Sequence, residues 1–133
     1  MRWVLRLALS AVFLAAPALG DTPLSAEAFE ARTTGRTMTY ADDGQVWGRE
    51  QYLSGRRVIW AFEGEECKRG IWDEVQPGLI CFAYEDAPDD TECWHFFDRE
   101  GRLFAQLEHD TDAMSLAAVD ETAKGLVCGG LGV

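Results

Sequence analysis

The chain has 133 residues, of which 12 are Lys or Arg and 23 are Asp or Glu, so its formal net charge is −11. This length fits one domain with one core rather than several domains. The negative charge repels phosphate backbones and anionic headgroups, which argues against nucleic acid or a membrane surface as a partner. Cationic proteins, peptides or metal ions are favoured instead, although acidity also serves simply to keep a protein soluble.

Residues 1–20 predict a cleaved signal peptide. Two arginines precede an apolar run at positions 7–19, and small residues occupy the −3 and −1 positions of a cleavage site before Asp21. The run has 13 residues, fewer than the ~20 that a membrane-spanning helix needs; a retained anchor is the alternative. Cleavage leaves a single domain, residues 21–133, with a net charge of −13. We therefore expect a periplasmic or secreted protein without membrane contact after cleavage.

Residues 21–36 predict a short N-terminal helix. Ser25 suits the N-cap, because its side-chain oxygen can accept a hydrogen bond from the free N–H groups of the first turn. Glu27 and Glu30 suit the first turn, where the helix dipole favours negative charge. Gly35 suits the exit from the helix.

From residue 37 onward, short β-rich runs alternate with turn signals every eight to twelve residues, which is typical of an antiparallel meander. The expected strands are 37–41, 46–53, 57–63, 67–75, 79–85, 92–98, 102–108 and, as a further candidate, 114–119. The expected turns are Asp42-Asp43-Gly44, Ser54-Gly55, Glu63-Gly64-Glu65, Gln76-Pro77-Gly78, Ala87-Pro88-Asp89-Asp90 and Arg99-Glu100-Gly101.

The sequence therefore predicts a mostly β fold, in which an antiparallel meander closes into a small, about eight-stranded barrel or sandwich behind a short N-terminal helix. Closure removes the two exposed edges that an open sheet would have. The interior of a barrel of about eight strands is just wide enough for side chains or one small ligand. The full chain contains five tryptophans, so we expect that interior to be mostly filled.

Ring-bearing side chains recur with the two-residue period of a strand, so they share one face. In the run 57–63, Val58, Trp60 and Phe62 lie on one face, and the residues between them lie on the other. We expect the same face of the sheet to carry Trp72, Ile80, Phe82, Tyr84, Trp94 and Phe96.

Four cysteines, Cys67, Cys81, Cys93 and Cys128, predict two disulfides in an oxidising compartment. Their spacings of 14, 12 and 35 positions lack the close cysteine pairs of a zinc site. If the aromatic faces form one core, Cys81 and Cys93 lie on the same face of neighbouring strands. We therefore expect Cys81–Cys93 and, by elimination, Cys67–Cys128. A Cys67–Cys93 bond would span an intervening strand over roughly 9–10 Å, beyond the usual Cα limit of about 7 Å.

No group of residues amounts to an enzyme signature. His95 has no Ser or Cys motif nearby, so it fits a structural or surface role better than that of a general base. Residues 108–112 combine acids with His109 but lack the central glycine and closing glutamate of a calcium loop. We assign no catalytic, cofactor-binding or metal-binding residue. Three carboxylate pairs fit solvated turns, but would form a negative rim if two of them met at one barrel end: Asp42-Asp43, Glu65-Glu66 and Asp89-Asp90.

Four segments carry a resemblance to a known family: Arg56-Arg57-Val58-Ile59-Trp60-Ala61-Phe62, Cys67-x-x-Gly70-x-Trp72, Ile80-Cys81-Phe82-x-Tyr84-Glu85-Asp86 and Cys93-Trp94-x-Phe96-Phe97. In these segments the chain resembles a family of small secreted Gram-negative proteins known only as a domain of unknown function. The resemblance runs from about Leu24 to Val133. It implies that the cysteines and tryptophans form the framework of an exported domain, and it brings no activity, ligand or catalytic residue with it.

We expect a non-catalytic exported domain that uses an acidic rim or an open barrel end to bind a cationic protein, peptide or small ligand. One version, by analogy of fold alone, is an inhibitor of a basic envelope enzyme such as lysozyme. A hydrolase is an alternative, and it would need His95 or His109 beside an acid and a nucleophile in one cleft. The other alternative, a barrel that carries a small apolar ligand, requires a cavity lined by Trp60, Phe82, Tyr84, Trp94 and Phe96. The sequence does not specify the ligand, the physiological role or the oligomeric state.

Overall fold

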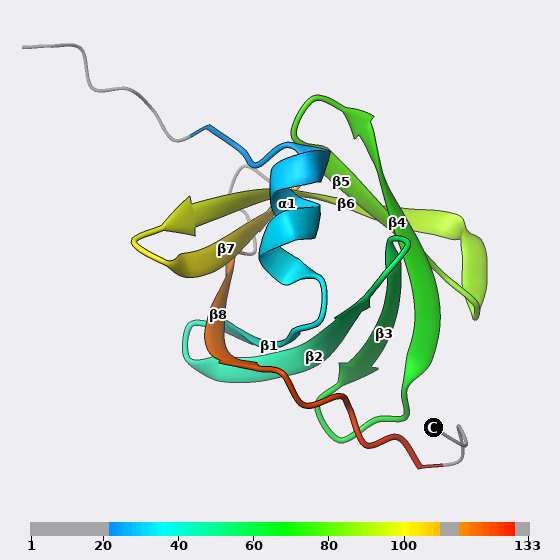
Figure 1. The fold of residues 1–133 in the computed structure, drawn as a ribbon. Helices are drawn as coiled ribbons and strands as arrows, with labels where there is room; N and C mark the ends of the chain where they lie inside the picture. Colours follow the sequence, from blue (N-terminus) through cyan, green and yellow to red (C-terminus); the bar gives the residue numbers. More distant parts are fainter. Residues whose placement is uncertain (1–21, 110–114, 130–133) are drawn as a thin grey trace, which may run out of the picture.

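The computed structural model describes residues 22–109 and 115–129, so the expected signal peptide lies outside the described residues. Within this part, one helix, α1 (Ala26–Thr33), is followed by eight strands, each antiparallel to its neighbours. β8 pairs with β1, so the sheet closes into a barrel (Figure 1). The expected mostly β fold with a short N-terminal helix is confirmed, as a barrel. The strands are β1 (Thr37–Asp42), β2 (Gln45–Leu53), β3 (Arg57–Phe62), β4 (Lys68–Gln76), β5 (Leu79–Tyr84), β6 (Ala87–Arg99), β7 (Arg102–Leu107) and β8 (Ser115–Thr122).

The hairpin between β5 and β6 differs from the sequence-based expectation. The sequence predicts a turn at 87–90, but the turn is formed by residues 85–86, and β6 begins directly after it. The register of the two strands shifts between Phe82 and Tyr84. β6 therefore carries extra residues opposite the end of β5, as in a large bulge. Pro88, which has no N–H for the ladder, is among these extra residues.

The helix is shorter than the predicted span of 21–36, because α1 covers eight residues. Ser25 caps its N-terminus as expected, and the Ser25 hydroxyl accepts a hydrogen bond from the Ala28 N–H at 3.2 Å. After the helix, Gly35 adopts a φ of +83°, and its N–H donates to the carbonyl oxygen of Tyr52 at 2.9 Å. This bond directs the chain from α1 into the wall of the barrel.

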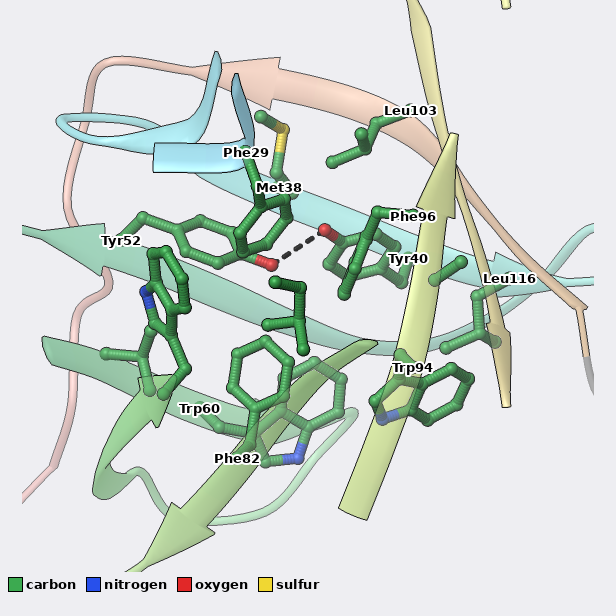
Figure 2. Packing of buried hydrophobic residues seen from close by; sticks show 14 of the residues in the cluster. Phe29, Met38, Tyr40, Tyr52, Trp60, Phe82, Trp94, Phe96, Leu103 and Leu116 are labelled. Carbon is green, nitrogen blue, oxygen red and sulfur yellow. Dashed lines mark hydrogen bonds between the residues drawn. The ribbon is translucent and has the colours of Figure 1, made fainter. Parts of the chain in front are cut away.

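Ring-bearing side chains point into the barrel, as the two-residue period predicts (Figure 2). The inward residues of neighbouring strands pair directly, for example Trp72 with Phe82. The hydroxyls of Tyr40 and Tyr52 form a buried hydrogen bond of 2.8 Å in the middle of this cluster. The aromatic members of the buried cluster are Phe29, Tyr40, Tyr52, Trp60, Trp72, Phe82, Trp94 and Phe96.

α1 closes one end of the barrel, which we call the closed end (Figure 1). From α1, the fully buried Phe29 enters the interior, with its ring centroid 4.3 Å from that of Phe96 and 5.0 Å from that of Trp72. The β2–β3, β4–β5 and β6–β7 turns lie at this end, where Arg56 and Gly101 form hydrogen bonds with side chains of α1. The β1–β2, β3–β4 and β5–β6 connections lie at the opposite end, the open end, because successive strands alternate in direction.

Two disulfides join Cys81 to Cys93 and Cys67 to Cys128, the same pairs that the register argument favours. Cys81 and Cys93 face each other directly across β5 and β6. Cys67 precedes β4 at the open end, so its bond fastens the segment after β8 to that end. Both bonds are compatible with an oxidising compartment.

Candidate ligand-binding site

The open half of the barrel interior contains a pocket of about 220 Å³, to which every strand contributes a wall residue. The closed half, where Phe29 lies, is filled, whereas the open half keeps this pocket between its buried side chains. The expectation of a mostly filled barrel is therefore wrong for the open half. Pockets for drug-sized ligands begin at about 300 Å³, so this one suits a smaller molecule. Its walls include all five residues of the carrier hypothesis: Trp60, Phe82, Tyr84, Trp94 and Phe96.

Four rings form a continuous aromatic wall on one side of the pocket. The ring centroid of Trp47 lies 5.3 Å from those of Trp60 and Phe62 and 5.9 Å from that of Trp94. The Trp60 and Phe62 rings meet edge to face at 5.3 Å. Aromatic rings present a negative π-face, so such a wall can bind apolar groups and can also attract a cation.

A β-bulge places Trp47 in this wall. Tyr40 of β1 pairs with Gly48, whereas the next residue, Ala41, pairs with Val46. Trp47 is thus the extra residue on β2, and its side chain joins those of the even-numbered residues in the interior. Bulges re-aim side chains in this way at barrel rims and binding sites.

Two glycines leave room for the rings. A Cβ atom at Gly70 would lie 2.6 Å from Cδ1 of Tyr84, and one at Gly48 would overlap the Trp60 indole. Any larger residue at these two inward positions would push the Trp60 or Tyr84 ring out of its place. The glycines therefore fix the shape of the pocket wall.

Glu50 of β2 is an acidic residue of the pocket wall with only 2% of its surface exposed. The Tyr84 hydroxyl donates a hydrogen bond to Oε1 of Glu50 at 2.8 Å, while Oε2 has no hydrogen-bond partner among the described residues. Burial raises the pKa of Glu50 to about 8, although the Tyr84 hydrogen bond and the charge of Lys68 act to lower it. Glu50 is therefore mostly protonated at neutral pH.

Lys68 lies at the mouth of the pocket and holds a cation against aromatic rings. Its Nζ atom is 5.1 Å from the ring centroids of both Phe62 and Tyr84, and 3.3 Å from Oδ2 of Asp86. This is the geometry of a cation–π contact supported by a carboxylate. The mouth thus already holds one ammonium group, that of Lys68.

The three carboxylate pairs named from the sequence all lie at the open end, at the β1–β2 turn, in the β3–β4 loop and at the start of β6. The expected condition for a negative rim is therefore met. Of the acids at this end, Asp86, Asp90 and Glu92 also line the pocket. We define the acidic rim as Asp42, Asp43, Glu65, Glu66, Asp86, Asp89, Asp90 and Glu92, all exposed.

The two histidines are not brought together, and neither lines the pocket. Nδ1 of His95 lies 3.0 Å from the carbonyl oxygen of Gly78, and the largely exposed His109 lies beside Glu108, with 3.3 Å between Nε2 and Oε2. Residues 110–112 of that acidic loop lie outside the described residues. In the part of the chain that the structure describes, no group of three or more His, Cys, Asp or Glu side chains could hold a metal ion.

Sequence reasoning missed Trp47, Glu50 and Lys68. The alternation of residues along β2 could have indicated Glu50. This residue lies two positions from the buried Tyr52, on the same face of the strand, and pairs directly with Trp60. A carboxylate among inward positions indicates a functional group. Trp47 carries no such signal, since only the bulge turns it inward.

No family model, curated protein sequence or solved structure matches the chain. The resemblance to a family of secreted Gram-negative proteins therefore stays an expectation. Within residues 22–109 and 115–129, no helix has the length and apolar character needed to cross a bilayer.

Proposed function

We propose that this protein is a non-catalytic, exported binding protein whose open barrel end takes up a small organic molecule with a positive charge and an apolar part. The observation that carries the proposal is the combination, in one pocket, of an aromatic wall, a buried carboxyl group and the acidic rim. Aromatic rings and carboxylates together are the usual means of recognising organic cations.

The acidic rim supports a cation over an anion or a neutral polar ligand. Its exposed carboxylates surround the mouth of a cavity with apolar walls, and such a mouth concentrates opposite charge and raises the rate of association. The ammonium group of Lys68 already lies over two rings and beside Asp86, so a ligand cation would bind apart from it, against the other rings of the pocket.

The size of the pocket supports a small ligand over a protein surface. About 220 Å³ of space is enclosed by barrel strands rather than spread over a flat face. A cationic protein partner, including a basic envelope enzyme, would have to insert a single side chain into this pocket. The export that we propose agrees with the two disulfides, which persist in the periplasm or outside the cell.

A matched pair of probes tests the proposal: phenethylamine, which is cationic, and phenethyl alcohol, which has the same apolar part without the charge. Binding to the oxidised protein is measured by calorimetry and by the fluorescence of the pocket tryptophans. We expect the amine to bind at least tenfold more tightly than the alcohol. We also expect its affinity to fall severalfold between about 0.02 and 0.5 M salt, because screening weakens steering by the rim.

Three outcomes would contradict the proposal. Equal affinity for the amine and the alcohol would indicate a carrier of apolar molecules. Binding of a lysine-rich peptide without binding of the small amine would indicate a protein partner. Turnover of an ester or amide probe that is lost with His95→Ala or His109→Ala would indicate a hydrolase.

A further inference from the structure

We propose that the ligand is a primary or secondary organic amine, bound as its ammonium ion, and that Glu50 anchors it by accepting an N–H hydrogen bond at Oε2. The inference rests on the proposed function, because it names the ligand class of the same pocket. It goes further by assigning the anchoring atom and the group that the atom recognises.

The carboxyl group of Glu50 is only partly satisfied. Glu50 lines the pocket, and its Oε2 is buried and has no hydrogen-bond partner among the described residues. A buried polar atom without a partner costs free energy, so such atoms are rare in folded proteins. An N–H donor from a ligand would satisfy it.

The charge of Glu50 depends on the titratable groups around it. These are Tyr84 from β5, Lys68 from β4, Tyr40 from β1 and Tyr52 from β2. Burial keeps the pKa of both Tyr40 and Tyr52 well above its usual value, so neither tyrosine carries charge at neutral pH. Lys68 already pairs with Asp86. Lys68 still favours the ionised form of Glu50, but burial outweighs it, and an incoming ammonium ion would add the further positive charge that ionised Glu50 needs.

A free Oε2 distinguishes amines that have an N–H from quaternary ammonium ions. Both kinds can lie against the aromatic wall and gain a cation–π contact. Only the first can also donate a hydrogen bond to Oε2. Charge-assisted hydrogen bonds in water-excluded sites are stronger than neutral ones, so a primary or secondary amine satisfies the whole pocket and a trimethylated analogue leaves Oε2 unpaired.

Binding in this way releases a proton. The free protein holds Glu50 mostly protonated at pH 7, because its pKa is about 8. When the ammonium ion binds, the carboxyl O–H bond breaks and the proton passes to the buffer, while the ligand keeps all its own protons. The expected release is about 0.9 proton per ligand at pH 7 and close to 0.1 at pH 9.

The test is calorimetry of phenethylamine binding to the wild-type protein in buffers of different ionisation enthalpy, which counts the protons released. The amine stays charged up to pH 8.5, as lysine does with a pKa of about 10.4. We expect the affinity to rise about eightfold from pH 7 to 8.5, as the ionised fraction of Glu50 rises. We also expect phenethyltrimethylammonium to bind at least tenfold more weakly at pH 8.5.

Glu50→Gln should abolish proton release and the rise in affinity with pH, and should weaken amine binding at pH 8.5 at least tenfold. The matched control is Glu27→Gln, which removes the same charge from an exposed position of α1 and should leave all three readouts unchanged. If Glu50→Gln does not fold, Tyr84→Phe replaces it. This second variant removes the hydrogen bond to Oε1 and should shift the midpoint of the affinity curve to higher pH.

The outcomes separate this inference from the proposed function. Equal binding of phenethylamine and its trimethyl analogue, with no proton released, would overturn the anchoring role of Glu50 and keep the cation site. Failure of both cations to bind would overturn the proposed function itself. Binding that weakens above pH 8 would show that protonated Glu50 donates to a neutral acceptor, and would overturn the amine as the ligand.

Discussion

The two ends of this barrel use charge in different ways. At the closed end, acids and bases are paired: Arg32 donates hydrogen bonds to Asp98 and Glu121, and Arg56 donates to Glu30 and Asp73. At the open end, Lys68 pairs with Asp86 and Arg49 pairs with Glu63, but no salt bridge is formed by the other seven acids of the rim among the described residues, and Asp90 and Glu92 line the cavity. The same eight strands thus carry a neutralised end that fixes a helix and a negative end that faces solvent.

The difference separates stability from function. Paired charges around α1 orient the helix so that Phe29 fills the closed half of the barrel interior. The open half holds fewer side chains than it has room for, which leaves the pocket. Glu50 lies at the boundary between the two halves. A buried carboxyl group reduces stability, which agrees with the role in binding that we propose for Glu50.

The closed end should carry most of the stability, and Phe29→Ala tests this most strongly. The ring is fully buried and contacts Tyr52, Trp72, Phe82 and Phe96. We expect the free energy of unfolding to fall by about 3–5 kcal/mol, because removing the ring leaves a cavity. Urea unfolding measures the change. A loss below about 1 kcal/mol would mean that α1 does not plug the barrel.

The disulfide at the open end should have the next largest effect, because no helix within residues 22–109 and 115–129 covers that end. Replacing both Cys67 and Cys128 by Ser opens a loop with a sequence separation of 61, and we expect a loss of about 2–4 kcal/mol. The matched control replaces Cys81 and Cys93, which are separated by only 12 positions. The chain-entropy account predicts a smaller loss for this second pair, and equal or reversed losses would contradict it.

The barrel wall could be predicted from the sequence because it follows a local rule. The two-residue period along the strands is kept by Trp60, Trp72, Phe82 and Trp94. The hairpins pair even-numbered residues with even-numbered residues, so these side chains stay on the same face of the sheet. The disulfide pairs followed from the same rule. The period does not depend on distant parts of the chain, so it can be recognised in each strand separately.

The pocket could not be predicted in the same way, because it depends on departures from that rule. The bulge that turns Trp47 inward arises from the register between β1 and β2, which the local pattern does not encode. The β5–β6 turn was placed wrongly because Pro88 and the acids after it have turn composition, whereas the chain reverses at residues 85–86. The empty space beside Glu50 depends on how deeply Phe29 enters from the other end.

Glu50→Gln should change stability with pH, which tests whether the boundary residue is buried and protonated. An unfolded glutamate loses its proton near pH 4.5, but folded Glu50 keeps it up to about pH 8. The unfolded state thus binds fewer protons in this window, so the stability of the wild type falls as pH rises from about 4.5 to 8. The variant lacks this loss.

The expected advantage of Glu50→Gln over the wild type therefore grows across that window and levels off above it, on the order of a few kcal/mol at pH 8.5, since one pKa unit is worth about 1.4 kcal/mol. Urea unfolding at pH 5 and 8.5 measures it, with Glu27→Gln as the control. The same difference at both pH values would show that Glu50 is ionised in the folded protein.

The acidic rim should affect ligand binding while barely affecting stability. Asp90→Asn combined with Glu92→Gln removes two exposed charges at the pocket mouth, and we expect the free energy of unfolding to change by less than about 0.5 kcal/mol. The association rate of phenethylamine should fall severalfold at low salt and match the wild type at high salt, because steering acts through the screened field of the rim. Stopped-flow quenching of tryptophan fluorescence measures the rate.

The control pair, Glu27→Gln with Glu100→Gln, removes the same charge from the closed end. If this pair slows association equally, net charge rather than the rim attracts the ligand, and the two ends do not differ in the way proposed.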